Sequence, residues 1–307
     1  MGELMDSSIA LAQIVPMLIV IVSIAAIVSW AMSGSITIGL IVSVAVTLIV
    51  GLQFTKAAEV ITNAPTLVFG ITTDNHWGYP GWSRDDQVAK LNTAISEWAA
   101  AKVDFIAING DTVTGDVVGR TEVDALDLYA DFRSVFDASS SPHYYEIGNH
   151  EHIIGYTAAQ DVTMWQTGTG MTTTTYSHDV NGVHFVWINA DSDHPTTVAQ
   201  LTWLTNDLAA TSLPVILFTH EPLVSINGAA VYAGGAAIEA ILVASGKVKA
   251  CFYGHIHNPD HAVVDGIQHI ISPAMYGSTS PSNYRTIVSI YPSGKINVNW
   301  RTIAFDI

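Results

Sequence analysis

The distribution of apolar and polar residues divides this chain into two parts. From Ser7 to Thr55 there is no charged residue, and two apolar stretches, Ile9 to Trp30 and Ile36 to Phe54, flank a short polar break. A helix of roughly 20 apolar residues, rising about 1.5 Å per residue, covers the ~30 Å hydrocarbon core of a bilayer. The pattern therefore predicts two all-apolar helices, which we interpret as a transmembrane hairpin.

Two alternatives to a membrane hairpin exist. A removable signal peptide is disfavoured because the N-terminal tail, residues 1–7, carries Glu3 and Asp6 where a signal peptide carries Lys or Arg. An apolar hairpin could instead form the core of an oligomer or filament, since apolarity all round a helix does not identify what surrounds it. Lys56 is the one basic residue near the ends of the two stretches, so the positive-inside rule has little to count. The acidic N-terminus and the Lys-poor remainder of the chain lead us to expect the rest of the protein on the extracytoplasmic side of the membrane, with the opposite orientation as the alternative.

The remaining sequence alternates between strand and helix patterns. We expect residues 8–55 to form the apolar helices, 56–64 a linker and 65–307 a separate domain. Within Arg84 to Ala101, apolar residues recur with helical spacing, and β-rich runs flank this segment on both sides. Such β-α-β units predict parallel strands. The first half of the domain is expected to contain strands Thr66–Thr72, Val103–Asn109 and His143–Ile147, with helices Arg84–Ala101 and Glu122–Phe136.

The second half of the domain adds antiparallel pairing. Asn181-Gly182 suits a tight hairpin turn between the strands Thr174–Ser177 and Val183–Asn189. Residues 168–175 are expected to form a surface loop or a flap. Further along we expect helices Val198–Leu208 and Gly235–Ala244, and strands Val215–Thr219, Val248–Tyr253, Ala262–Val264, Gln268–Ser272, Thr286–Tyr291 and Ile296–Thr302. Together these elements predict an α/β fold with two mixed sheets packed face to face and helices outside.

Charge and cysteine content narrow the functional classes. The formal net charge of −16 argues against non-specific nucleic-acid binding, which requires neutralisation of phosphates by Lys and Arg. A single cysteine, Cys251, excludes an internal disulfide framework, and its apolar run predicts a buried strand residue.

Five short motifs gather histidine, carboxylate and amide side chains, and four of them follow predicted strands directly. They are Asp74-Asn75-His76, Gly110-Asp111, Gly148-Asn149-His150-Glu151, Thr219-His220 and Gly254-His255-Ile256-His257. Histidine and carboxylate are the side chains that bind zinc, manganese, iron or nickel. We therefore expect one rim of a sheet to carry a metal site.

Asp-Asn-His and Gly-Asp are weak signals when taken alone, Gly-Asn-His-Glu after a strand is much more specific, and the combination of all five motifs is a strong signal. Of the 12 histidines, five fall at strand ends beside Asp, Asn or Gly, which packing alone does not explain. A carboxylate such as Asp111 has two oxygens and can bridge two cations. An imidazole such as that of His150 ordinarily titrates near neutral pH and can therefore give up a proton.

In this order, the motifs resemble those of the calcineurin-like metallophosphoesterase superfamily, and the resemblance covers Thr66 to Ser272. It implies a four-layer α/β/β/α sandwich and a dinuclear metal-dependent phosphoesterase that uses metal-activated hydroxide, with Asp111 as the bridging ligand and His150 as the general acid. Carried over by position, it implies a first metal held by Asp74, His76, Asp111 and His257, and a second held by Asp111, Asn149, His220 and His255.

The resemblance also bears on the metals. Purple acid phosphatases, a branch of the superfamily, carry a metal-ligating tyrosine three residues after the bridging aspartate, whereas this chain has Thr114 there. They also lack a histidine at the position of His76. Two divalent ions such as Mn, Zn or Fe are therefore expected, without an iron(III)-tyrosinate site.

The sequence is compatible with several substrates and assemblies. Phosphate monoesters and diesters both fit, as do small-molecule and lipid-linked substrates, and the aromatic loop from His76 to Arg84 would suit a flat group attached to phosphate. One rival is a structural subunit whose apolar helices form a homo-oligomer or filament core. Another is a metal-dependent binding module without turnover.

Overall fold

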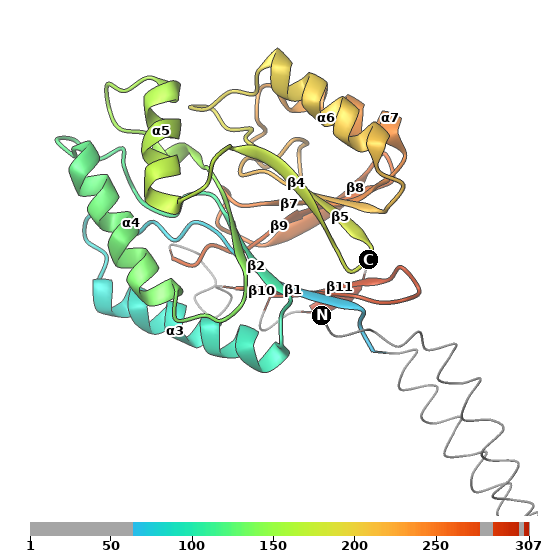
Figure 1. Cartoon of the computed structure of the whole chain (residues 1–307), viewed down its shortest axis with the longest axis horizontal. Coiled ribbons are helices and arrows are strands. Elements are labelled where there is room, and N and C mark those ends of the chain that lie inside the picture. Colours follow the sequence, from blue (N-terminus) through green and yellow to red (C-terminus); the bar gives the residue numbers. More distant parts are fainter. Residues whose placement is uncertain (1–63, 277–284, 301–303, 307) are drawn as a thin grey trace, which may run out of the picture. The chain divides into compact units, whose positions relative to one another are not determined.

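Two mixed sheets lie face to face in the part of the chain that the structure describes, with helices on both outer sides (Figure 1). This computed structural model describes residues 64–276, 285–300 and 304–306. Pro65 to Ile307 form one compact unit. No helix among the described residues is long and apolar enough to cross a membrane, and the apolar helices predicted over residues 8–55 lie outside the described residues.

The first sheet has the strand order β12-β11-β10-β1-β2-β3. Its parallel part consists of β1 (Leu67–Thr72), β2 (Phe105–Asn109) and β3 (His143–Glu146). The antiparallel part consists of β10 (Thr286–Ile290), β11 (Ile296–Asn299) and β12 (Ala304–Asp306). The register pairs Phe69 with Phe105, so both rings project from the same face of the sheet.

The second sheet has the order β4-β5-β6-β7-β9-β8. Four neighbouring strands are parallel: β5 (Val183–Ile188), β6 (Val215–Phe218), β7 (Val248–Tyr253) and β9 (Ile267–Ile271). The antiparallel strands β4 (Thr175–Val180) and β8 (Asp260–Val264) form its two edges. Both sheets are thus mixed, as predicted.

Helices cover the two outer faces (Figure 1). The outer face of the first sheet packs against α3 (Arg84–Ala101), α4 (Glu122–Phe136) and α5 (Ala158–Thr169), and that of the second sheet against α6 (Val198–Ala210) and α7 (Gly235–Ser245). Cys251 of β7 is fully buried beneath α6 and α7, as expected. The layers therefore follow the predicted α/β/β/α order.

Aromatic rings fill the space between the sheets. Phe69 stacks on Phe105 at 5.1 Å between ring centroids, and meets Phe185, Phe218 and Phe252 edge-on at 5.4–6.0 Å. Offset and edge-to-face contacts of this kind are the favoured arrangements of aromatic pairs. This central core fixes how the two sheets face each other, and hence which strand ends lie opposite one another.

Helix α5 was not predicted. Its Thr- and Gly-containing sequence has low helix propensity, and the loop or flap expected over residues 168–175 instead begins with the last residues of this helix. Packing accounts for it: Trp165 is fully buried, and a Cβ on Gly168 would lie 2.3 Å from the Tyr129 ring of α4. Tertiary contact therefore overrides local preference at this position.

Candidate metal centre

The predicted site residues come together at the carboxyl ends of the parallel strands. Asp74 and His76 follow β1, Asp111 follows β2, and His220 follows β6. Asn149 and His150 lie in a 3-10 turn, η1 (Asn149–Glu151), after β3, and His255 and His257 follow β7. Open α/β sheets bind ligands at this edge.

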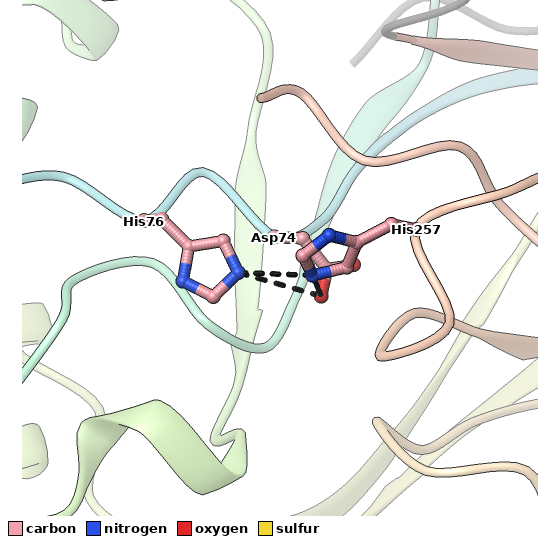
Figure 2. Close-up of side chains that lie close together, drawn as sticks. All are labelled: Asp74, His76 and His257. Atoms are coloured by element: carbon pink, nitrogen blue, oxygen red, sulfur yellow. Dashed lines mark hydrogen bonds and ion pairs between the residues drawn. The ribbon is translucent and has the colours of Figure 1, made fainter. Parts of the chain in front are cut away.

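One cluster contains Asp74, His76 and His257, whose ligand atoms face one another (Figure 2). The Nε2 atoms of His76 and His257 are 3.1 Å apart, and Asp74 Oδ1 lies 3.2 Å from His257 Nε2 and 3.9 Å from His76 Nε2. Ligands that hold one cation at about 2.0–2.2 Å lie roughly 3 to 3.5 Å from each other. The spacing in this cluster therefore suits a cation.

A second cluster contains Asp74, Asp111 and His220. His220 Nε2 lies 3.1 Å from Asp111 Oδ2, and Asp111 Oδ2 is also 3.8 Å from His76 Nε2. Asp111 thus reaches both clusters. His150 forms a third group with His76 and Asp111, although the sequence assigned it no ligand role.

Asn149 and His255 lie together beside these clusters. His255 Nδ1 is 2.9 Å from Asn149 Oδ1, and the backbone N–H of His255 donates to both oxygens of Asp74 at 3.1 Å. All seven residues that the sequence singled out as ligands are therefore brought into one region, although His255 belongs to none of the three histidine and carboxylate groups of the described residues.

Five of these residues have a left-handed backbone. Positive φ angles of 45–66° occur at Asp74, His76, Asp111, His255 and His257. Non-glycine residues avoid this region, and such strain collects at functional sites. The other non-glycine residues with positive φ among those described are Lys102, Asn181, Asn227 and Asp265. The strain is thus concentrated where the ligand side chains must converge.

Glycines before the ligands permit close approach of the backbone. A Cβ on Gly110 would lie 2.2 Å from His220 Nδ1, and a Cβ on Gly254 would lie 2.0 Å from Thr73 Oγ1 and 2.7 Å from Asp74 Oδ2. Glycine is therefore required sterically at both positions.

The surroundings set the charge state of the ligands. Burial lowers the pKa of His76 to about 4, although the Asp111 and Asp74 carboxylates oppose this shift. A neutral imidazole has a lone pair available for a metal. Burial by itself would raise the pKa of Asp111, but the neighbouring His220, His76 and His150 lower it overall, so Asp111 is a carboxylate.

Two buried side-chain atoms are available as metal ligands. Within the described part of the chain, neither Asp111 Oδ2 nor His220 Nε2 has a hydrogen-bond partner, although both side chains are almost completely buried. Buried polar atoms are normally satisfied. His220 Nδ1–H donates to the carbonyl of Asn109 at 2.9 Å, which leaves Nε2 as the ligand atom. The donor set therefore fits two divalent cations.

His150 is paired with a residue that sequence analysis missed. Its Nδ1 lies 2.9 Å from the Asp116 carboxylate, which accepts the hydrogen bond. Burial would lower the pKa of His150, but this hydrogen bond and the Asp111 charge raise it to about 9. With this pairing, both nitrogens of the imidazole are protonated and the ring is positively charged at neutral pH. The only signal in the sequence was the position of Asp116 five residues after Asp111.

Two further residues organise the site without having been assigned a role. Glu151 accepts hydrogen bonds from the backbone N–H groups of Asp111, Thr112 and Gly148 at 2.6–3.0 Å, and so ties two motif loops together. Thr114 Oγ1 lies 3.4 Å from His76 Nδ1, at the position where purple acid phosphatases carry tyrosine. Glu151 could have been noticed because it ends the Gly-Asn-His-Glu motif.

A family model for calcineurin-like phosphoesterases matches residues 67–259, which is more than half of the chain. The chain therefore belongs to the calcineurin-like phosphoesterase family, as the motif order indicated. It is a metal-dependent phosphoesterase whose Asp and His clusters can hold two metals.

Solved structures share the fold at low sequence identity. A dimetal phosphatase from Danio rerio is similar with a TM-score of 0.65 and 16% identity, over 79% of this chain and 99% of that one. GAP50, the anchor in the inner membrane complex of Plasmodium, has a TM-score of 0.54 and 13% identity, over 78% and 88%. A purple acid phosphatase from yellow lupin has a TM-score of 0.56 and 13% identity, over 77% of this chain but 52% of that one. None of the curated proteins matches the chain by sequence.

Proposed function

We propose that this protein is a membrane-anchored dinuclear phosphoesterase that hydrolyses phosphate mono- or diesters. The observation that carries the proposal is the buried pair of Asp111 Oδ2 and His220 Nε2, 3.1 Å apart and without hydrogen-bond partners among the described residues. A divalent cation between these two atoms would satisfy both of them.

Asp111 would bridge the two metals, because its carboxylate reaches both clusters. The first metal would be held by Asp74, His76, Asp111 and His257, and the second by Asp111, Asn149, His220 and His255. Two bound divalent cations, with Mn, Zn or Fe as the preferred candidates, would activate water for attack and take up charge on the phosphoryl oxygens.

His150 would act as the general acid. It would hold a proton for the leaving alkoxide, while Asp116 accepts from Nδ1–H and directs Nε2 away from that hydrogen bond. Its ring lies 4.7 Å from that of His76, between centroids, and so adjoins the first metal cluster. A positioned acid of this kind contributes about 10² to 10⁴ in rate.

The test is a panel of phosphate mono- and diesters on the full chain in detergent, after EDTA treatment and after restoring Mn, Zn or Fe(II). We expect hydrolysis only with metal restored. His150→Asn should lower kcat by about 10²- to 10⁴-fold while metal analysis still finds two ions per chain. His143→Asn is the matched control, because His143 begins β3, the strand whose far end leads to His150.

Each contrary outcome has a separate meaning. Absence of hydrolysis with every restored metal would refute the phosphoesterase. An unchanged kcat in His150→Asn would refute only the general-acid role, and loss of a metal in that variant would reassign His150 as a ligand.

The membrane and assembly proposals have different support. The uncharged run from Ser7 to Thr55 supports a membrane anchor, with the catalytic domain on the extracytoplasmic side. A purely structural role, with the apolar residues as an oligomer core, would leave the full set of ligand residues unexplained. We therefore favour the enzyme.

A further inference from the structure

Three aromatic side chains form a continuous surface beside the first metal cluster. Tyr79, Trp82 and Tyr276 are here called the aromatic wall. Ring centroids are 4.5 Å apart for Tyr79 and Trp82, and 4.3 Å apart for Trp82 and Tyr276. The rings of Trp82 and Tyr79 lie roughly perpendicular to the ring of the metal-ligand candidate His76, with centroids 5.6 and 6.0 Å away, respectively. The wall thus begins at the metal cluster.

Backbone hydrogen bonds connect the wall to that cluster. The N–H of Tyr79 donates to the carbonyl of His76 at 3.0 Å, and the N–H of Trp82 donates to that of Tyr79 at 3.2 Å. Tyr276, nearly 200 residues further along the chain, donates its N–H to the carbonyl of Asp74 at 3.3 Å. Both segments of the wall therefore have a fixed position relative to the ligands.

The wall is not part of the core. Its rings belong to none of the apolar clusters of the described residues, and Tyr79 is 40% exposed while the other two are half-buried. In contrast, Trp77 in the same loop is 2% exposed and packs against Phe132. Leaving large aromatic surface in water forgoes hydrophobic stabilisation. Partly exposed aromatic side chains beside a metal cluster are therefore candidate contacts for a ligand.

A positive charge adjoins the wall. Lys90 Nζ lies 4.4 Å from the centroid of the Tyr276 ring and donates to the carbonyl of Met275 at 3.5 Å. In a chain with a net charge of −16, this ammonium favours an anionic ligand over a neutral aromatic one. Flat rings, a cation and a neighbouring metal cluster together match a heterocyclic base joined through a sugar to a phosphate.

We propose that the aromatic wall stacks a nucleobase, so that nucleoside phosphoesters are the substrate class of this site. This inference rests on the proposed hydrolase. The phosphate would lie at the metals, and the base would lie one sugar away on Trp82 and its neighbours. Stacking of a base on an aromatic side chain contributes ~1–3 kcal/mol to binding. This corresponds to a change in the dissociation constant of about 5- to 150-fold.

The test compares two esters that share a leaving group. Adenosine 5′-monophosphate and ribose 5-phosphate release the same type of alkoxide and differ only in the base, and their methyl diesters form the equivalent pair for a diesterase. We expect kcat/KM for the nucleotide to exceed that for the sugar phosphate by about tenfold or more in the wild type. Trp82→Leu and the more exposed Tyr79→Leu should bring this ratio near one, mainly through KM.

The control is Tyr291→Leu, because Tyr291 is a half-buried tyrosine with a lysine, Lys295, 5.4 Å from its ring, outside the wall. It should keep the wild-type ratio. A ratio near one in the wild type, or an unchanged ratio in both wall variants, would overturn the proposal. Hydrolysis of other phosphoesters but of neither pair would also overturn it, while leaving the phosphoesterase in place.

A binding measurement makes the test independent of turnover. With Mn-loaded His150→Asn protein, calorimetry should find the nucleotide bound about tenfold more tightly than ribose 5-phosphate, and this difference should vanish when Trp82→Leu is added. If no ester is hydrolysed under any condition, the hydrolase fails, yet this difference still decides whether the wall recognises a base.

Discussion

At the scale of single residues, Gly110 has no acceptable substitute. Its φ is +83°, and a Cβ would lie 2.2 Å from His220 Nδ1. The imidazole would have to move, which would break its hydrogen bond to the Asn109 carbonyl. Displacing a catalytic group by about 1 Å costs on the order of 10²-fold in rate.

We therefore predict that Gly110→Ala loses the metal held by His220 and lowers kcat/KM about 100-fold. Metal content by mass spectrometry and ester hydrolysis are the measurements. Gly266→Ala separates steric contact from backbone strain, because Gly266 also has a φ of +83° but a Cβ there would meet nothing within 4 Å. Two metals and full activity in Gly110→Ala would contradict the steric argument.

His194, which is not one of the metal-ligand candidates, makes the stability of the fold depend on pH. It is 1% exposed, its Nδ1 lies 2.9 Å from Asp191, and its Nε2 lies 3.8 Å from Asp161, which also binds His152. Burial would lower the pKa of His194, but the neighbouring carboxylates of Asp161 and Asp191, the second of them hydrogen-bonded to Nδ1, raise it from 6.5 to about 10. The protonated imidazole therefore stabilises the folded state.

Because the folded pKa exceeds the unfolded one, this stabilisation is complete below about pH 6.5 and disappears as the pH rises towards 10. Comparing the wild type with His194→Gln by urea unfolding of metal-loaded protein should give a difference in unfolding free energy that is large at pH 6 and shrinks by pH 10. Exposed His261→Gln controls for loss of a histidine. A difference that stays constant with pH would contradict the charged pair.

At the scale of elements, helices with strong local signals were predicted closely. The bounds of α3 and α4 agree with the predicted Arg84–Ala101 and Glu122–Phe136, since apolar spacing and N-cap residues are local information. Ser83 and Thr121 supply those caps. In contrast, α5 depends on packing against α4, and β12 pairs with β11 beyond the predicted last strand. Neither was visible in local pattern.

The strands also explain why the motifs could be found. Parallel strands all end at the same edge of a sheet, so a motif that follows a predicted strand has a predictable location. What the pattern could not indicate is the backbone between strand and ligand. The positive φ angles at His255 and His257, for example, turn both side chains towards Asp74 and Asn149.

At the scale of the whole molecule, Asn109 joins the two sheets at the site. It ends β2 in the first sheet, and its Nδ2 donates to the carbonyls of Thr219 and Phe252 in the second, at 3.3 and 3.2 Å. These are the strand ends that precede His220 and His255. The metal centre is thus a product of how the sheets face each other.

The apolar run before this domain leads to a prediction for the full chain. If residues 8–55 span a bilayer, the protein should partition into the detergent phase and float with liposomes, and replacing two central residues, Ile21 and Val44, by Lys should abolish this while ester hydrolysis is kept. If these residues instead form an oligomer core, the wild-type protein should stay in the aqueous phase as a large assembly detected by light scattering.

The sequence by itself determined the motif order, the ligand residue types, the strands that deliver them and the uncharged run of residues 7–55, because each is written in local composition and spacing. Only the tertiary structure decided that Asp111 reaches both clusters, that Asp116 holds His150 and that Tyr276 joins Trp82 in one wall. Those contacts link residues that are far apart in the chain, and they depend on sheet packing and backbone angles that no local pattern encodes.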